Sequence, residues 1–240
     1  MRIYLCGQRH FGAQVFDALR ALRVLDFFSG QEETVEIVGV SSPAHSSGKT
    51  TTGEPLPDRL RASAQRAGVP WLPSGQLRAA DVVAARVDLI VAAHSHDFLG
   101  SATRAAARLG AIGYHPSFLP IHRGRDAVRW TIKMGDRIAG GSVYWLDRNV
   151  DGGPIAAQEP ILVRPGETVD SLWRELLAPL GVKLLRRVVA DLAAGQIVAV
   201  PQDEACATWE PSWSRPPIFR PELPQLGGGP SGYTVTTHRD

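Results

Sequence analysis

The residues in this sequence best suited to chemistry are His115 and Asp151. His115 follows an apolar run that predicts a strand, and the loop after it contains Pro116, Pro120 and Gly124, which exclude a helix. Asp151 precedes two glycines on a predicted turn. Separately, the histidine could cap a sheet edge and the aspartate could simply form the turn. Together they predict an imidazole oriented by a carboxylate, a pair that can shuttle a proton and stabilise a developing oxyanion in acyl transfer.

A glycine-flanked turn from Gly7 to Gly12 follows the first predicted strand. A dinucleotide-binding fingerprint would need a further glycine between these two, so a nicotinamide cofactor is not expected. Such a turn still exposes backbone N–H groups to an anionic ligand, and Gln8, Arg9 and His10 are available for side-chain contacts. A plain structural turn accounts for this stretch equally well.

Two other motifs suggest chemistry that their context does not support. Ser47-Gly-Lys-Thr50 resembles the end of a phosphate-binding loop, but Pro43 stands where that loop needs its first glycine. His94 and His96 could face one metal ion, yet Asp97 is at the wrong offset for a metallohydrolase pattern and no later Asp-His cluster completes a site. We therefore expect no metal, and this segment is predicted to form one wall of a pocket or a polar loop.

The elements that must position these side chains alternate between strands and helices. This order predicts parallel βαβ units, with His94 and His115 at the carboxyl ends of strands, where open α/β sheets bind ligands. The predicted strands are Arg2–Cys6, Val35–Val40, Val69–Leu72, Val87–Ala93, Ala111–Tyr114, Gly141–Leu146, Ile155–Leu162 and Ile197–Val200. The predicted helices are Ala13–Leu25, Asp58–Ala67 with Asp58 as N-cap, Ala79–Arg86, Ser101–Leu109, Ala127–Met134 with Asp126 as N-cap, and Val169–Ala194 with a kink or break at Pro179 and Gly181. Ser41–Pro57 is predicted to be a mobile polar loop.

Composition bounds the class of protein. A chain of 240 residues can bury a full core, and a formal net charge of +2 gives no argument for nucleic acid or an anionic membrane surface. No apolar run reaches the roughly 20 residues that a membrane helix needs. Cys6 and Cys206 are far apart and are predicted to be free thiols, which fits a reducing cytoplasm. We expect residues 1–200 to form the catalytic domain and residues 201–240 to form an extended tail rich in proline and glycine, packed through Trp209, Trp213 and Phe219.

Several of these motifs together resemble a known family. The stretch from His115 to Gly124, Trp130, the run from Gly140 to Trp145 and the turn from Asp151 to Ile155 are similar to the signature of the formyltransferases that use 10-formyltetrahydrofolate. That family includes glycinamide ribonucleotide, methionyl-tRNA and sugar-nucleotide formyltransferases and the hydrolase domain of 10-formyltetrahydrofolate dehydrogenase. The resemblance implies an α/β, doubly wound, mainly parallel sheet of formyltransferase type.

The resemblance also implies roles for individual residues. His115 matches the catalytic histidine and Asp151 the catalytic aspartate, and no metal is needed. The folate would lie against two segments, and the turn at residues 8–12 would face the acceptor. Arg9, Arg123 and Arg125 could meet an acceptor phosphate, or be ordinary surface arginines. The implied folate-binding residues are His94, Ser95, His96, Asp97, Phe98, Arg148, Asn149, Val150 and Gly152, and those facing the acceptor are Gln8, Arg9, His10 and Gly12.

One residue departs from the family pattern. Most of the transferases carry an asparagine two residues before the histidine, and this chain has Gly113 there. Gly113 has no side chain to donate a hydrogen bond in place of that asparagine, and loss of one oxyanion donor can reduce a rate by about 10² to 10³. Gly113 could also leave space for a water or for a bulkier acceptor. In this respect the sequence is closer to the hydrolase domain, which releases the formyl group to water.

The sequence therefore predicts formyl transfer from 10-formyltetrahydrofolate to an amine of a small, phosphate-bearing acceptor, such as an amino sugar nucleotide. Hydrolysis of the donor to formate is the alternative. A folate-binding protein without catalysis is disfavoured because both His115 and Asp151 are present. A tRNA acceptor is not expected, because the roughly forty residues after Pro201 are too few for a further barrel domain. The sequence does not indicate an oligomeric state.

Overall fold

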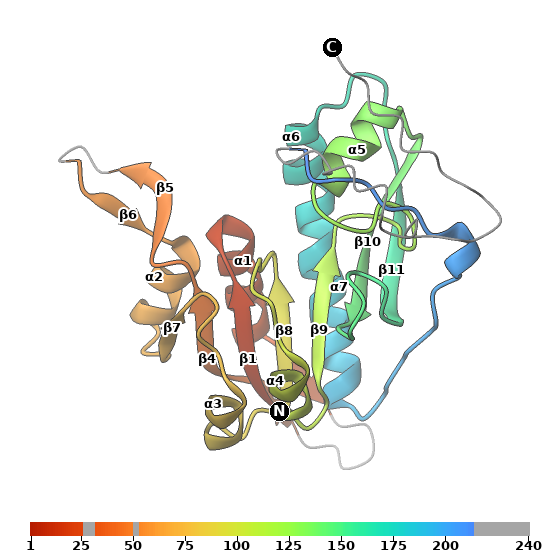
Figure 1. Cartoon of the computed structure of the whole chain (residues 1–240). Coiled ribbons are helices and arrows are strands. Elements are labelled where there is room, and N and C mark those ends of the chain that lie inside the picture. Colours follow the sequence, from red (N-terminus) through yellow and green to blue (C-terminus); the bar gives the residue numbers. More distant parts are fainter. Residues whose placement is uncertain (26–31, 50–52, 214–240) are drawn as a thin grey trace, which may run out of the picture.

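A central sheet of seven strands organises the molecule. The computed structural model describes residues 1–25, 32–49 and 53–213. The strand order is β11-β10-β9-β8-β1-β4-β7. Neighbours from β9 to β7 are parallel, and β10 runs antiparallel to both β9 and β11. Helices cover both faces (Figure 1), so the predicted α/β, mainly parallel architecture is confirmed.

The helices and strands have the following bounds. The sheet contains β1 (Arg2–Gly7), β4 (Glu36–Ser42), β7 (Trp71–Pro73), β8 (Leu89–Ala93), β9 (Ala111–His115), β10 (Ile138–Trp145) and β11 (Ile155–Leu162). Two hairpins lie outside it and consist of β2 (Arg23–Leu25) with β3 (Glu32–Thr34) and β5 (His45–Lys49) with β6 (Pro55–Pro57). The α-helices are α1 (Arg9–Arg20), α2 (Arg59–Arg66), α3 (Ala79–Ala84), α4 (Ser101–Ala105), α5 (Ala127–Met134), α6 (Val169–Ser171) and α7 (Ala178–Ala193).

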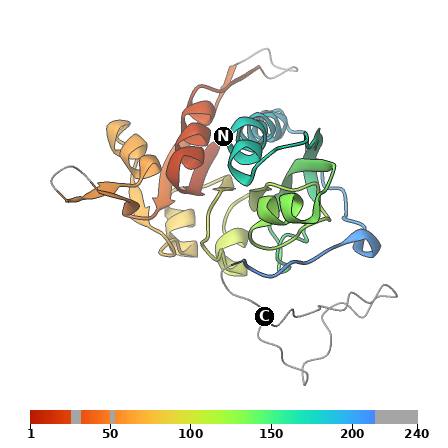
Figure 2. The ribbon, with the colours of Figure 1, turned by 90° about the horizontal axis from the view of Figure 1, so that it is seen from above.

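The side chains of β1 show how each face of the sheet is buried. Ile3 and Leu5 join the larger apolar cluster, which α1, α2 and α7 complete, while Tyr4 and Cys6 belong to a second cluster on the opposite face with α3. Figure 2 shows these two groups of helices on opposite sides of the sheet. A strand buried on both faces must be apolar at every position, which explains why β1 and β8 read as continuous apolar runs.

The longest predicted helix is continuous, and its irregularity precedes the proline. Residues 172–177 form a π-helical turn between α6 and α7. Pro179 follows directly after this turn, so the hydrogen bond that its missing N–H cannot make falls where the helix is already irregular. Gly181 allows α7 to approach the sheet, because a Cβ there would lie 2.6 Å from Cε1 of Tyr114 and 2.8 Å from Cζ of Phe11. Of the predicted kink or break at Pro179 and Gly181, the break is therefore wrong, and the irregularity lies in the turn just before them.

The predicted turn from Gly7 to Gly12 is wrong in extent. Helix α1 begins at Arg9, because the Asp58 carboxylate accepts a hydrogen bond from the Arg9 backbone N–H at 2.8 Å and satisfies the start of the helix. The same carboxylate caps α2 through the Leu60 N–H, which confirms the predicted N-cap. Helix α1 ends at Arg20 rather than Leu25, since β2 pairs with β3 instead.

Other boundaries also differ from the prediction. Most of the predicted polar loop from Ser41 to Pro57 is strand, because β4 extends to Ser42 and β5 pairs with β6. The Ser47–Lys49 part of the phosphate-loop-like motif lies in β5, and Thr50 lies outside the described residues. Helices α3 and α4 are shorter than predicted. Residues 197–200 do not form a full strand; only Val200 bridges to Ile155.

Residues 201–213, which we call the C-terminal strap, run beside β11 and turn back towards α5 (Figure 1). The strap contains one short 3₁₀ helix, η2 (Glu204–Cys206). Trp213 packs edge-to-face against Trp130 of α5, with ring centroids 5.2 Å apart. Phe219 lies outside the described residues, so the predicted contact through it and the division into a domain of residues 1–200 and a tail remain predictions.

None of the helices within the described ranges is long and apolar enough to cross a membrane.

Candidate active site

A cavity of about 1230 Å³ opens at the carboxyl ends of β8 and β9. The loop after β8, the loop after β9, the turn after β10, helix α5 and the π-helical turn contribute its lining. This is the position at which ligands bind open α/β sheets. Most of the predicted site residues line this cavity: Arg9, His94, Ser95, His96, Asp97, Phe98, Gly113, His115, Arg125, Arg148, Asn149, Val150 and Asp151.

The predicted catalytic pair meets at the floor of the cavity. Nδ1 of His115 and Oδ2 of Asp151 are 3.6 Å apart, and both side chains are largely buried. His115 is the last residue of the fully buried strand β9, which fixes its backbone. Asp151 has a positive φ of 52° in its turn. The Gly124 N–H donates to Oδ2 of Asp151 at 2.7 Å, so this loop and turn are bonded to each other.

The hydrogen bonds of the imidazole fix where its protons lie. Nε2 of His115 is 2.7 Å from the backbone oxygen of His122. A carbonyl oxygen can only accept, so Nε2 carries a hydrogen in both the neutral and the charged ring. Nδ1 is then the atom that gains or loses a proton, and it faces Asp151. At 3.6 Å this nitrogen and the carboxylate oxygen are close enough for charge attraction when the ring is protonated, but too far apart for a direct hydrogen bond.

The C-terminal strap holds the carbonyl that His115 uses. The backbone N–H of His122 donates to Oγ1 of Thr208 at 2.8 Å, and the Thr208 N–H donates to the Pro120 oxygen at 3.1 Å. The His122 ring lies between two carboxylates, with Nε2 2.5 Å from Asp136 and Nδ1 3.0 Å from Glu210. Burial lowers the pKa of His122, but its contacts with Glu210 and Asp136 outweigh burial and raise that pKa above its ordinary value.

A second part of the strap holds the turn that carries Asp151. The Gln202 amide N–H groups donate to the backbone oxygens of Asp151 and Gly153 at 2.8 and 2.7 Å. Its oxygen accepts from Nε and Nη2 of Arg123 at 3.1 and 2.8 Å. Glu204 accepts two further bonds from Arg123, at 2.8 and 2.7 Å. Gln202 thus joins the Asp151 turn to the loop after His115.

Arg123 does not reach the cavity. It is 2% exposed, and its guanidinium is engaged by Gln202 and Glu204. Its interpretation as a contact for an acceptor phosphate is therefore not supported, because its donors already have partners. Arg125 lines the cavity and is exposed, together with Arg129, Lys133 and Arg148, whereas Arg104 lines it and is half-buried.

The space beside Gly113 is filled. A Cβ at this position would lie 3.0 Å from Cδ2 of Leu146 and 3.3 Å from Cε1 of Tyr144, so these two residues occupy the space that a side chain would take, although Gly113 itself lines the cavity. The Tyr144 hydroxyl donates to Oδ1 of Asp151 at 2.5 Å. Tyr144 is a site residue that the sequence analysis did not identify. Its sequence signals are its position in a predicted strand next to the Asp151 turn and in the run from Gly140 to Trp145.

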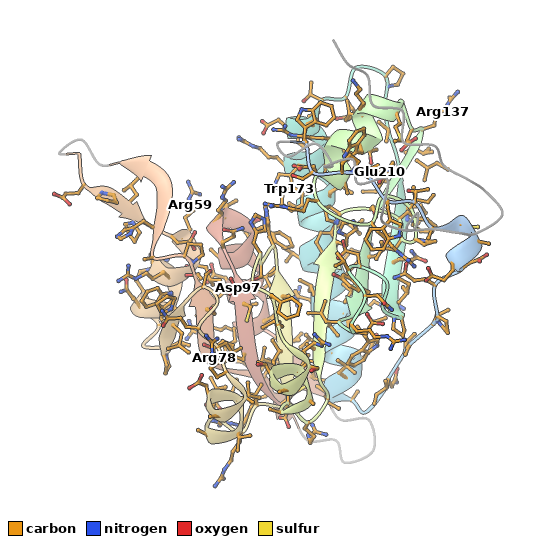
Figure 3. The ribbon with its side chains drawn as sticks, viewed as in Figure 1. Arg59, Arg78, Asp97, Arg137, Trp173 and Glu210 are labelled. Carbon is orange, nitrogen blue, oxygen red and sulfur yellow. The ribbon has the colours of Figure 1, made fainter. Side chains whose placement is uncertain are left out.

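The segment after β8 forms one wall of the cavity. His94 has a positive φ of 57° and packs edge-to-face on Trp173, with ring centroids 5.5 Å apart. Figure 3 shows Trp173 at this upper end of the sheet. Burial is the main cause that lowers the pKa of His94 to about 4, and His96 and Arg9 lower it further, so the ring is neutral at pH 7. The Asp97 carboxylate accepts from the Ser41 hydroxyl at 3.2 Å, and the Phe98 ring is 90% exposed.

The predicted acceptor turn reaches the cavity through one residue. Arg9 lines the cavity. Its charge acts on His96, because burial, Arg125 and Arg9 together lower the pKa of that histidine. His10 points elsewhere, with Nδ1 3.1 Å from Arg59, and lines a separate hollow of about 310 Å³. Gln8 is 8% exposed and is outside the lining, as is Gly12, which packs against Leu60.

The turn after β10 is fixed by close approach. A Cβ at Gly153 would lie 1.8 Å from the Trp145 backbone oxygen, so only glycine fits there. Gly152 lies beside the lining residues Asn149 and Val150 but does not itself line the cavity. Within the described part of the chain, no group of three or more His, Cys, Asp or Glu side chains is placed to hold a metal ion.

Comparison with known proteins gives consistent matches. The formyl transferase family model matches residues 22–189. Mitochondrial 10-formyltetrahydrofolate dehydrogenase from Homo sapiens is 33% identical over 219 residues, which cover 88% of this chain and 22% of that protein. The chain therefore spans about a fifth of the length of this curated relative. Glycinamide ribonucleotide transformylase 1 from Symbiobacterium toebii matches with a TM-score of 0.66 and 22% identity, over 85% of this chain and 94% of that one. A sugar 3N-formyl transferase solved with dTDP and 5-N-formyl-THF matches with a TM-score of 0.64 and 11% identity, over 88% and 69%.

Proposed function

Because the chain belongs to the formyl transferase family, we propose that it transfers a formyl group from 10-formyltetrahydrofolate to an amine of a small, phosphate-bearing acceptor. The observation that carries this proposal is the pair formed by Nδ1 of His115 and Oδ2 of Asp151, 3.6 Å apart at the cavity floor. Transfer of a formyl group to an amine releases one proton from the attacking nitrogen. A paired imidazole and carboxylate can take up that proton and return it to the leaving nitrogen.

Each residue of the pair has a distinct task in this proposal. Nε2 of His115 is committed to the His122 carbonyl, so the protonated ring donates from Nδ1 to the formyl oxygen as negative charge develops there. Oδ2 of Asp151 accepts the proton that the attacking amine loses. As the new C–N bond forms and the bond from the formyl carbon to folate N10 breaks, the pair delivers a proton to N10. Bound folate supplies only the activated formyl carbon.

The cavity fits both ligands by size and chemistry. Its volume of about 1230 Å³ exceeds the 300–1000 Å³ typical of one small-molecule site. The exposed Phe98 ring, the neutral His94 ring and Trp173 offer flat, largely apolar surfaces for a folate. Arg9 and Arg125 are exposed lining residues that can bind an acceptor phosphate. An amino sugar nucleotide satisfies these requirements.

The test is the turnover of 10-formyltetrahydrofolate by purified protein, followed as tetrahydrofolate released, with and without a panel of amino sugar nucleotides. We expect an acceptor-dependent rate. Asp151→Asn and His115→Ala should each reduce that rate by at least about 100-fold, whereas Asp191→Asn, which alters a carboxylate on α7 away from the cavity, should not. Full activity in Asp151→Asn would refute the assignment.

Hydrolysis is the second candidate, and two observations favour it. Position 113 contributes no side-chain donor, and the curated relative above that is 33% identical is a 10-formyltetrahydrofolate dehydrogenase. In this case water replaces the amine, and Asp151 takes a proton from water. Formate released in equal amount to tetrahydrofolate, at a rate that no acceptor increases, would establish this candidate over transfer.

We also expect the protein to act in a reducing cytoplasm, because neither cysteine in the described ranges forms a disulfide: Cys6 is a buried free thiol and Cys206 an exposed one.

A further inference from the structure

We propose that Tyr144 is a positioning residue for Asp151, and that Gly113 is the residue that makes room for it. The inference rests on the proposed function, because it assigns a role within the same proton-transfer pair. Tyr144 on β10 stands directly opposite Gly113 on β9 in the antiparallel pairing. Directly opposed side chains on adjacent strands are close neighbours. With no side chain at Gly113, the Tyr144 ring occupies the space beside its Cα.

A side chain at position 113 would force Leu146 and the Tyr144 ring to give way by a few tenths of an ångström. A Cβ there would be 3.3 Å from Cε1 of Tyr144 and 3.0 Å from Cδ2 of Leu146, both closer than ordinary van der Waals contact. The Tyr144 side chain is 7% exposed, so the ring has little freedom to move aside. Position 113 therefore controls where the hydroxyl of Tyr144 lies.

The hydroxyl distinguishes the two oxygens of the carboxylate. Oδ1 of Asp151 accepts from Tyr144 at 2.5 Å, whereas Oδ2 accepts from the Gly124 N–H at 2.7 Å and faces His115. With each oxygen held by its own donor, the carboxylate cannot rotate about its Cβ–Cγ bond without losing a bond. Oδ2 therefore stays next to Nδ1 of His115, as proton transfer requires.

Tyr144 is suited to act as a permanent donor. Burial and the adjacent Asp151 carboxylate raise the pKa of Tyr144 well above its ordinary value, so the hydroxyl keeps its proton. The other two buried tyrosines in the described sheet use backbone acceptors instead: Tyr4 donates to the Val40 oxygen at 3.3 Å and Tyr114 to the Leu177 oxygen at 2.6 Å. Tyr144 alone among these three contacts a cavity carboxylate.

Tyr144→Phe is the direct test, because it removes only the hydroxyl. A hydrogen bond to a charged group contributes enough for its loss to lower kcat by about 10- to 100-fold, with KM for 10-formyltetrahydrofolate unchanged within about twofold. The acid limb of the kcat/KM profile should move to higher pH, because a carboxylate that loses a donor is protonated more readily. Tyr4→Phe is the matched control, since it deletes a buried tyrosine hydroxyl from outside the cavity, and its kcat and pH profile should match wild type.

Gly113→Val provides a second variant that displaces the ring without altering the hydroxyl. It should reduce kcat and shift the acid limb in the same direction as Tyr144→Phe. If Tyr144→Phe and Gly113→Val both keep the wild-type kcat and pH profile while Asp151→Asn is inactive, the positioning role is wrong and the proposed function stands. If Asp151→Asn is also fully active, the proposed function itself fails.

Discussion

Gln202 offers the sharpest test of whether the C-terminal strap organises the candidate site. Replacing it by alanine removes two donated bonds to the backbone oxygens of Asp151 and Gly153 and two bonds accepted from Arg123. Arg123 keeps its two bonds to Glu204, so its charge remains paired. The perturbation therefore falls mainly on the turn that carries Asp151.

The expected magnitude follows from these four bonds. A typical bond contributes about 1 kcal/mol net, and bonds to a charged group contribute about 1.5–3 kcal/mol. Gln202 is only partly buried, so water can replace part of what is lost. We expect a loss of about 2 kcal/mol in the free energy of unfolding, which lowers Tm by about 4–8 °C for a domain of this size. A displacement of Asp151 of the order of 1 Å could lower kcat by about 100-fold.

The assay combines thermal unfolding with steady-state turnover of 10-formyltetrahydrofolate. Gln202→Glu separates the two sets of contacts, because a carboxylate still accepts from Arg123 but cannot donate to the turn. It keeps the contact with Arg123 but loses the support of the turn, so its kcat should fall as far as that of Gln202→Ala. Gln196→Ala removes an exposed glutamine that precedes the strap, and both its Tm and its kcat should remain unchanged.

A Gln202→Ala variant with the expected lower Tm but a kcat within twofold of wild type would refute a catalytic role for the strap. The strap would then stabilise the fold without holding the catalytic geometry. An unchanged Tm together with an unchanged kcat would show that the four bonds are replaced by solvent at no cost.

Three further predictions concern pH and packing. Burial lowers the pKa of His94 to about 4 in the folded state, so acidification from about pH 6.5 to pH 4 protonates this residue in the unfolded chain first. Over that pH range the free energy of unfolding of wild type should fall by on the order of 2 kcal/mol. The free energy of unfolding of His94→Gln, measured by urea unfolding at each pH, should fall by less. The raised pKa of His122 acts in the opposite sense. The stabilisation of the fold by protonated His122 is complete below about pH 6.5 and disappears as the pH rises through the folded-state pKa of this residue. Trp213 fluorescence should therefore report loosening of the strap on the alkaline side, and His122→Gln should abolish that transition. Gly153→Ala should lower the free energy of unfolding by more than about 3 kcal/mol in denaturant unfolding, because its Cβ would overlap the Trp145 backbone oxygen; a Tm equal to wild type would contradict the geometry.

The elements that the sequence predicts well are those that depend on local pattern. Strand β9 and the loop after His115 follow from an apolar run and closely spaced prolines, and helix α5 has the bounds that its periodicity predicts. Asp126 occupies the predicted N-cap position of α5, but its side chain does not cap the helix. It accepts instead from the Trp213 backbone N–H of the strap, a contact that no local pattern contains.

What the sequence could not predict depends on contacts across long separations. The start of α1 is set by Asp58, 49 residues away, and the support of the Asp151 turn by Gln202, 51 residues away. The role of Gly113 depends on the register that places it opposite Tyr144, and register cannot be read from two strands considered separately. Arg123 was predicted as a ligand contact because its position in the loop does not reveal Glu204 as its partner.

The π-helical turn at residues 172–177 has a consequence for how the chain can be shortened or aligned. Such a turn contains one residue more than an α-helix of the same rise, so deleting one residue, for example Glu175, would restore regular hydrogen bonding. The helix on either side would keep its phase, but residues within the turn would change direction around the axis, and Trp173 would move relative to both His94 and Phe11. The aromatic wall of the cavity is thus maintained by the length of this segment as well as by its side chains. Homologous chains should therefore be compared here by residue count before residue identity.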